Sequence, residues 1–268
     1  MGGRIADSLL EKGYSVFVCD KDKKLVKHFA EKGAITCQSP KEITQYVDVV
    51  FEVTPNDTTA REVWLGKEGV LASATPEKTL ITCATLSTEL VDELIVKCHK
   101  AKVAFFDISL TVGQSGLNLL CGGSKEELEE IRPALQVFAE KILYFDSRGH
   151  GIRYKLILNF LQAVHIVALG QTLKIASDQH MDIQKVAEAL VEKVGGNITK
   201  GTWLAYQNQN SDGKVTFPVE LITKDLTYAK QLAKHVDVNL LDAVLATYEK
   251  AMAKGLAKKS WTAINTLE

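Results

Sequence analysis

Two patterns of apolar and polar positions follow each other along the chain. Up to about residue 146, short apolar runs typical of buried strands alternate with stretches whose apolar residues recur at helical spacing. The alternation predicts an α/β domain with a doubly wound, mostly parallel sheet that helices cover on both faces. The predicted strands are Ser15–Cys19, Val47–Val53, Thr79–Cys83, Val103–Ile108, Asn118–Cys121 and Ile142–Tyr144, and the predicted helices are Arg4–Lys12, Lys23–Lys32, Thr58–Trp64, Glu89–Ala101 and Lys125–Ala139.

The strand pattern stops at residue 149, and only helical spacing follows. A long apolar helix is predicted over Ile152–Asp178, with shorter helices at Ile183–Val194, Lys224–Lys234 and Asn239–Lys254. The polar stretch Asn208–Lys214 predicts a loop. The sequence therefore predicts two domains: an α/β domain over residues 1–148 and an all-α domain over residues 149–268.

Composition narrows the function. The 268 residues carry a net charge of −1, which argues against a nucleic-acid partner. No apolar run approaches the length expected of a bilayer-spanning helix, and the N-terminus lacks a signal-peptide core, so no membrane partner is expected. Five cysteines without paired spacing and six scattered histidines predict neither a disulfide framework nor a metal site. These features favour a reducing, cytoplasmic setting.

The first twenty residues match the second half of a dinucleotide-binding unit. A glycine-containing helix start is followed by a strand that ends at Asp20. The first strand and G-x-G turn of such a unit are not in this sequence, so we expect a gap in the sheet and weak pyrophosphate binding. A late start site, a real loss in a decayed homologue, and another segment filling the gap all remain open.

Four residues are candidates for the cofactor side. A carboxylate at Asp20 can accept both ribose hydroxyls of NAD and would repel the phosphate of NADP, although an ordinary turn aspartate would look the same. Thr54, Pro55 and Thr88 follow predicted strands, and ligands of open α/β sheets lie at the carboxyl ends of strands. Asp57 and Thr58 are predicted to cap the helix after Pro55–Asn56.

The long helix carries the strongest catalytic candidate. Lys155, Asn159 and Gln162 share one face of an otherwise apolar helix. Desolvation lowers the pKa of a lysine, which suits proton transfer near neutrality, and Asn159 could orient the lysine or the substrate. The alternative is a lysine whose stem reaches out to solvent beside a satisfied asparagine.

Taken together, these motifs resemble the β-hydroxyacid dehydrogenases, the group of 3-hydroxyisobutyrate dehydrogenase, tartronate semialdehyde reductase and glyoxylate/succinic semialdehyde reductase. Met1-Gly2 match the end of that family's G-x-G-x-M-G motif. The segments SPKE, TPNDTTAREVWLG, LST, CGG, GHGIRYKLILN and FPVELITKDLTYA follow in the family's order. The resemblance implies a Rossmann-type domain followed by an all-helical domain, usually assembled into homodimers or homotetramers.

The resemblance also assigns roles. Lys155 would be the catalytic acid/base, and Asn159, Thr111 and Gly113 would contact a small hydroxy acid or semialdehyde. Gly2, Asp20, Thr54, Pro55, Thr88 and Lys224 would contact NAD, with NADP as the alternative cofactor. The implied activity is hydride transfer. Its rivals are a cofactor-deficient homologue that serves as a dimeric interaction module, and an imine-reductase-like enzyme.

The chain departs from the family around the expected substrate loop. The family's D-A-P-V-S-G-G is replaced by residues 107–113, in which Thr111 keeps a hydroxyl and Val112 stands for the first glycine. The stretches after Asp107 and after Thr88 are also shorter than in the family. Because glycine often serves where backbone approaches a ligand closely, Val112 is expected to narrow the substrate site.

Overall fold

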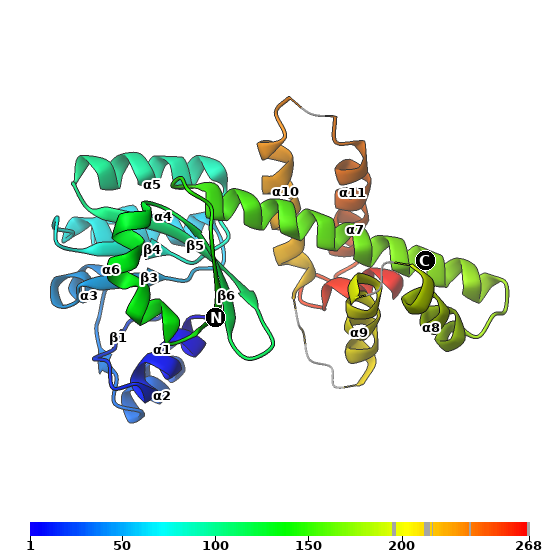
Figure 1. The fold of residues 1–268 in the computed structure, drawn as a ribbon, viewed down its shortest axis with the longest axis horizontal. Coiled ribbons are helices and arrows are strands. Elements are labelled where there is room, and N and C mark those ends of the chain that lie inside the picture. The colour runs from blue at the N-terminus through cyan, green and yellow to red at the C-terminus, as the bar shows by residue number, and fades with distance from the viewer. Residues whose placement is uncertain (195–196, 212–214, 216, 236, 267–268) are drawn as a thin grey trace. The chain divides into compact units, whose positions relative to one another are not determined.

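The computed structural model describes residues 1–194, 197–211, 215, 217–235 and 237–266 (Figure 1). It divides into two compact units, Met1–Lys155 and Leu156–Glu268. The division falls inside the long helix α7 (His150–Asp178), whose start lies next to the domain boundary predicted at residues 148 and 149.

The N-terminal unit is α/β, as the sequence predicts, and its strands form two sheets. β1 (Phe17–Val18) and β2 (Ile35–Thr36) form a parallel pair. The second sheet has the order β3-β4-β5-β6-β7; β3, β4 and β5 are mutually parallel, β6 runs antiparallel to β5, and β7 runs parallel to β6. Its strands are β3 (Val49–Glu52), β4 (Thr79–Thr82), β5 (Ala104–Val112), β6 (Leu117–Gly122) and β7 (Ala139–Tyr144).

The expected gap lies between β1 and β3. β1 accepts hydrogen bonds from β2 through the carbonyls of Val16 and Val18, and β3 pairs with β4. Within residues 1–194, which are all described, β1 pairs with no strand besides β2, and β3 with no strand besides β4. The α/β unit therefore has an interrupted sheet, with one unpaired strand edge on each side of the break.

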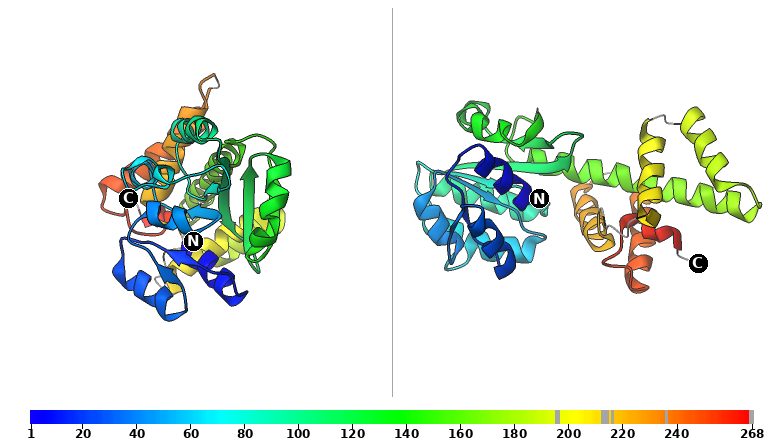
Figure 2. Two further views of the ribbon diagram at one scale, coloured as in Figure 1. Left: turned by 90° about the vertical axis from the view of Figure 1, so that its left-hand side faces the viewer. Right: turned by 90° about the horizontal axis from the view of Figure 1, so that it is seen from below.

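Helices cover the two faces of the five-stranded sheet (Figures 1 and 2). One apolar core includes Ile5 and Leu9 of α1 (Gly2–Glu11) together with side chains of α6 (Lys125–Gln136). The opposite core holds side chains of α4 (Asp57–Leu65), α5 (Thr88–Lys100) and the first turn of α7. The remaining helical elements of this unit are α2 (Lys23–Glu31), α3 (Pro40–Tyr46) and the 3-10 turn η1 (Val70–Ala72).

The C-terminal unit is all-helical in its described residues, as predicted. Its core joins the rest of α7 to the helices that follow, with Ile222, Leu226 and Tyr248 fully buried. α7 packs closely against the C-terminal segment at Gly170, where an added Cβ would overlap Oδ1 of Asn265. The following elements are α8 (Ile183–Lys193), α9 (Asn197–Ser211), α10 (Val219–Leu232), α11 (Asn239–Ala253) and the 3-10 helix η2 (Trp261–Thr266).

Apart from the two 3-10 elements, one strand and two helices were not predicted from the pattern. β2 is only two residues long, and both are exposed, so it has no apolar run. α3 is a seven-residue helix whose formation is favoured by the residues at its N-terminus. Ser39 caps it by accepting the N–H of Glu42, and Pro40 is its first residue. α9 extends through Ser211 into the stretch predicted to be a loop, and residues 212–214 of that stretch lie outside the described residues.

The expectation that no apolar run approaches the length needed to span a bilayer is wrong for α7. An 18-residue window of it reaches a mean hydropathy of 1.6, enough by length and composition for a membrane-crossing helix, and 44% of that window is buried. Core helices of soluble proteins pass the same test. The buried residues of α7, such as Leu156, Ile166 and Leu173, pack into the core of the helical unit, as a core helix does.

Candidate active site

Three cofactor candidates lie near the carboxyl end of β3. α1 begins at Gly2, and a Cβ there would lie 3.5 Å from Cβ of Val53, so the helix start is beside the strand end. Thr54 donates its N–H to Oε1 of Glu52 at 2.9 Å, while its hydroxyl is buried without a hydrogen-bond partner among the described residues. Pro55 follows, exposed, before α4.

The N-termini of α4 and α5 are tied together at the same edge. The cap of α4 is Asn56, which accepts the N–H of Thr59 at 3.0 Å, so the prediction that Asp57 or Thr58 caps this helix is wrong. Asp57 instead accepts the N–H and the hydroxyl of Ser87, the cap of α5. This link fixes Thr88, the half-buried first residue of α5.

These residues fit a dinucleotide. Parallel strands bring the starts of α1, α4 and α5 to one edge of the sheet, and helix N-termini attract anionic groups such as a pyrophosphate. The unpartnered Thr54 hydroxyl supplies a polar contact there. Asp20 is exposed after β1, where its Oδ1 accepts the N–H of Asp22 at 2.8 Å. Strand ends are where ribose-binding carboxylates lie in such folds.

The start of α7 is pressed against β5 and β6. Asp107, buried on β5, accepts the N–H of Gly149 at 2.6 Å and that of Ile152 at 2.8 Å. A Cβ on Gly151 would lie 2.4 Å from the carbonyl oxygen of Leu120 and 2.5 Å from that of Asp107. Gly149 has a φ of +84°, which glycine adopts without strain. The glycines of the GHGIRYK segment therefore allow the start of α7 to approach the sheet closely, one helical turn before Lys155.

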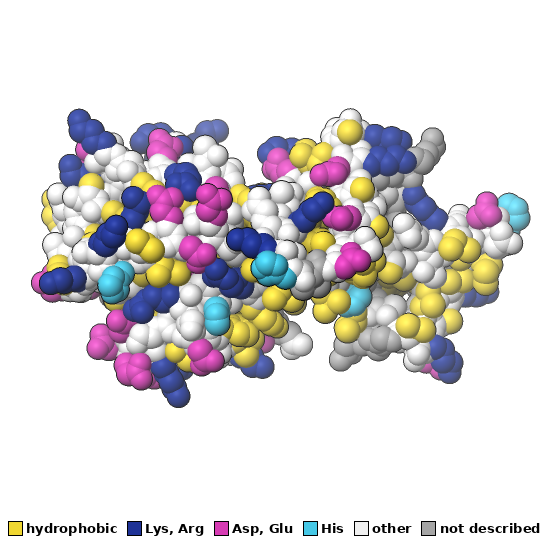
Figure 3. Space-filling model, turned by 90° about the horizontal axis from the view of Figure 1, so that it is seen from above, with side chains coloured by type: hydrophobic (Ala, Val, Ile, Leu, Met, Phe, Trp, Pro, Cys, Tyr) yellow, Lys and Arg dark blue, Asp and Glu magenta, His cyan; other side chains and the backbone are white. Residues whose placement is uncertain are grey.

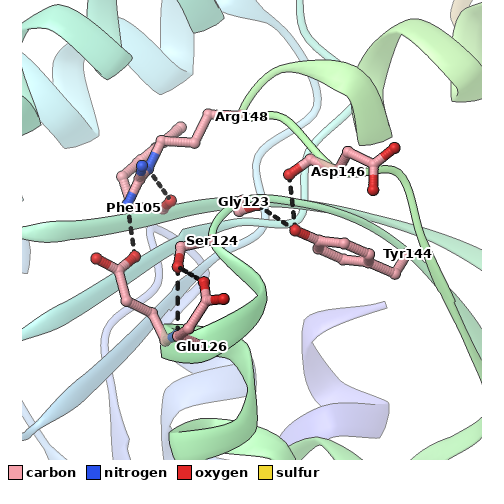
Figure 4. A network of polar contacts seen from close by, with 8 residues as sticks. Phe105, Gly123, Ser124, Glu126, Tyr144, Asp146 and Arg148 are labelled. Carbon is pink, nitrogen blue, oxygen red and sulfur yellow. Dashed lines mark hydrogen bonds and ion pairs between the residues drawn. The ribbon is translucent and has the colours of Figure 1, made fainter.

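Side chains on both sides hold this junction. Arg148 donates Nε to the carbonyl of Phe105 at 3.1 Å and pairs with Glu127, and the Tyr144 hydroxyl bridges the carbonyls of Gly123 and Asp146 (Figure 4). Further along the same turn, the ring of Tyr154 stacks on Phe145 at 4.3 Å, and Arg153 pairs with Asp92 at 2.9 Å.

Burial raises the pKa of Asp107 from 3.8 to about 6, opposed mainly by the hydrogen bonds from Ile152 and Gly149. An acid whose pKa is raised by folding stabilises the folded state most at pH below its unfolded pKa, and this stability is lost as pH rises through the folded value. We expect this contribution to fall by about 3 kcal/mol between about pH 3.5 and pH 7. Urea unfolding across that range checks it; the same component should be absent in Asp107→Asn.

The expected substrate residues fall on β5 and its hairpin. Thr111 is half-buried on β5 opposite Asn118. Gly113 lies in the turn, donates its N–H to the carbonyl of Gly116 at 3.0 Å, and lies beside the Glu140 carboxylate. Val112 is 62% exposed, so its methyl groups point to the surface and line a cavity of about 440 Å³ beside α1.

Lys155 and Asn159 lie one turn apart on α7. Lys155 is half-buried, whereas Asn159 is 2% exposed and donates Nδ2 to Oδ2 of Asp225 at 2.6 Å. The other carboxylate oxygen of Asp225 pairs with Nζ of Lys224 at 2.9 Å, and Nζ also lies 5.2 Å from the ring centre of Tyr228. The structure thus brings together Asn159 and Lys224, two of the predicted residues, through a shared carboxylate.

Sequence reasoning missed Asp107 and Asp225 as parts of the site. Asp107 begins the substrate-loop segment, and Asp225 lies in the segment FPVELITKDLTYA. Each is an acid in an otherwise apolar strand or helix face, and this unusual placement could have identified them. Among the described residues, no group of three or more His, Cys, Asp or Glu side chains could hold a metal ion.

Comparisons with known proteins identify the family of both parts of the chain. Residues 1–145 match the family model of the NAD-binding domain of 6-phosphogluconate dehydrogenase, and residues 149–267 match that of the NAD-binding domain of NADP-dependent 3-hydroxyisobutyrate dehydrogenase. Curated relatives include 3-sulfolactaldehyde reductase of Escherichia coli, 24% identical over 98% of this chain and 91% of the relative. The mitochondrial 3-hydroxyisobutyrate dehydrogenase of Mus musculus is 24% identical over 98% of this chain and 83% of its own length.

Solved structures show the same fold. 3-Hydroxyisobutyrate dehydrogenase of Mycobacterium tuberculosis, solved with L-serine, superposes with a TM-score of 0.88 at 23% identity and covers 99% of this chain and 94% of its own. An imine reductase of Myxococcus stipitatus, solved with NAD+, reaches a TM-score of 0.67 at 18% identity, covering 99% and 95%.

Proposed function

Because the chain belongs to the β-hydroxyacid dehydrogenase family of NAD(P)-dependent oxidoreductases, we propose that it interconverts a small 3-hydroxy acid and the corresponding semialdehyde, with Lys155 as the acid/base. The observation that carries this proposal is the start of α7. Asp107, Gly149 and Gly151 hold a lysine-bearing helical turn against the sheet of the dinucleotide-binding unit.

Each group has a part in the proposed reaction. When bound, a nicotinamide cofactor would supply hydride transfer, from the carbinol carbon in oxidation and to the carbonyl carbon in reduction. Neutral Lys155 takes the hydroxyl proton in oxidation, and the ammonium form returns it to the carbonyl oxygen in reduction. Asn159, held by Asp225, orients the substrate. Gly2, Thr54, Thr88 and Lys224 are proposed to hold the cofactor, and Thr111 and Gly113 the substrate.

A substrate panel tests the function. 3-Hydroxyisobutyrate and L-serine with NAD+ or NADP+, and 3-sulfolactaldehyde with NADH or NADPH, carry the chemistry that the relatives' names describe. We expect nicotinamide absorbance changes with at least one of these substrates, and their loss in Lys155→Ala. Turnover of none of them by a chain that binds the cofactor would refute the proposed substrate class.

The carboxylate of Asp20 supports a preference for NAD over NADP. In an active form we expect a higher kcat/KM with NAD, and Asp20→Ala should reduce that preference about tenfold, which corresponds to about 1.4 kcal/mol. Asp22→Ala is the matched control: it lies two residues further on and caps α2 by accepting the N–H of Lys24. A wild type that prefers NADP would show that Asp20 does not select the cofactor.

We propose that a second copy of the chain packs on the exposed face of α7. Ile157, Leu161 and Ile175 are 55%, 51% and 67% exposed, and Val164 and Ala168 lie between them at heptad spacing. Figure 3 shows hydrophobic side chains on the surface of the helical unit. This stripe is self-complementary in the sense that an apolar seam on one helix fits the same seam on another.

Sedimentation at micromolar concentration should therefore show a dimer or a larger assembly. Leu161→Glu should convert it to monomers, because a charge would be buried in the seam. Leu240→Glu, on α11 and 58% exposed, is the control that should keep the assembly. A wild-type chain that sediments only as a monomer contradicts the proposal.

A further inference from the structure

We propose that Asp107 is a positioning residue: its carboxylate fixes the helical turn that carries Lys155. This inference rests on the proposed acid/base role of Lys155. Asp107 itself lies on β5, far in sequence from the helix that it holds.

The contact is a clamp with two hydrogen bonds. Oδ1 accepts the N–H of Gly149 and Oδ2 that of Ile152, at 2.6 and 2.8 Å. Gly149 directly precedes α7 and Ile152 lies in its first turn, where backbone donors have no partner within the helix and the dipole favours a negative charge. A carboxylate supplied from the neighbouring strand therefore does what a local helix cap does elsewhere, and it also attaches the helix to the sheet.

The position of the clamp on α7 explains how it acts on Lys155. Gly149 and Ile152 donate their N–H groups to Asp107, and Gly151 lies against the carbonyls of Asp107 and Leu120. The start of α7 is therefore fixed at one point on β5 and β6. Lys155 is four residues after Gly151 and shares its face of the helix. A shift or tilt of the first turn therefore moves Lys155 with it.

The charge of Asp107 is costly at its position. The carboxyl is 1% exposed, and the nearby cation, Arg153, is shared with Asp92 and the carbonyl of Gly149. Cys121, on the neighbouring strand, is a buried thiol and offers no compensating charge. Burying this carboxylate adds little to the stability of the fold. We therefore attribute its two hydrogen bonds to the placement of α7 that the reaction needs.

The isosteric variant Asp107→Asn tests the proposal. An amide offers one acceptor, so one of the two N–H groups loses its partner. We expect hydrogen exchange of amides in residues 149–155 to accelerate at least tenfold, and kcat to fall at least tenfold with the KM for NAD+ within about twofold, because a 1 Å misplacement near a reacting group costs about 10²-fold. Asp182→Ala, which removes the cap of α8, is the control and should change neither quantity.

Three results would overturn the proposal: unchanged exchange in residues 149–155, kcat within twofold of wild type, or loss of exchange protection across the whole α/β unit. The last would mean a general structural role. Lys155→Ala separates this inference from the proposed function. Full turnover in Lys155→Ala refutes the acid/base role, whereas impaired Lys155→Ala alongside normal Asp107→Asn refutes only the positioning role.

Discussion

Lys155→Ala is expected to lower kcat by roughly 10²- to 10⁴-fold in a form of the protein that turns substrate over, the range that general acid/base catalysis contributes. The affinity for NAD(P) should barely change, because the proposed action of the amine is on the substrate oxygen. Steady-state kinetics with cofactor titration measure both quantities. The half-buried position of Lys155 on a fixed turn makes an effect on folding small by comparison.

Two further variants sharpen this prediction. Lys155→Arg should not restore turnover, since a guanidinium does not release its proton near neutral pH. Lys174→Ala, an exposed lysine further along the same helix, should leave kcat unchanged. Turnover of Lys155→Ala within a few-fold of wild type would end the proposed mechanism, and would leave Lys155 as a lysine whose stem reaches out to solvent.

Asp225→Ala should produce the largest loss of stability, about 3 kcal/mol in the free energy of unfolding, because removing one partner of a buried ion pair leaves the other uncompensated. The side chains of Asp225 and Lys224 are only 2% and 16% exposed, and Asn159 also loses its acceptor. Urea unfolding measures the loss. The same variant should raise the KM for substrate or lower kcat, since Asn159 is no longer oriented.

A second lysine–aspartate pair, between α10 and α11, provides the control. Lys230 of α10 pairs with Asp242 at 2.7 Å, but the two side chains are 51% and 46% exposed. Exposed pairs contribute less than about 1 kcal/mol, so Asp242→Ala should have a small effect. Equal losses in the two variants would show that burial of the Asn159–Asp225–Lys224 cluster does not matter.

The catalytic candidates were identifiable from sequence because they break a strong pattern. Lys155 and Asn159 stand at helical spacing in an apolar helix, and helical spacing alone places them on one face. Thr54, Pro55 and Thr88 follow strands that the apolar runs mark clearly. The contacts of these residues were not predictable, since Asn159 and Asp225 are 66 positions apart and no local signal pairs them.

The predictions of helix caps and element ends were wrong where several nearby residues could fill the same role, or where the apolar pattern is short or weak. Asn56, Asp57 and Thr58 are all residue types that cap helices, and only the tertiary contact between Asp57 and Ser87 decides that Asn56 takes that place. β5 and β6 extend further than their apolar runs, because pairing with each other carries both strands into the hairpin. α9 has a weak apolar pattern, and its helix depends on packing in the helical unit.

Local patterns were enough to predict the two-part α/β and all-α architecture, the interrupted dinucleotide-binding unit and the lysine-bearing helix, because periodicity and strand-to-helix alternation are local properties of the chain. The contacts of the buried acids follow only from the fold. Asp107 reaches α7 across 42 positions, and Asp225 joins Asn159 to Lys224 inside the helical core. Buried hydrogen bonds of this kind form between residues that folding brings together, and their geometry follows from packing rather than from sequence neighbours.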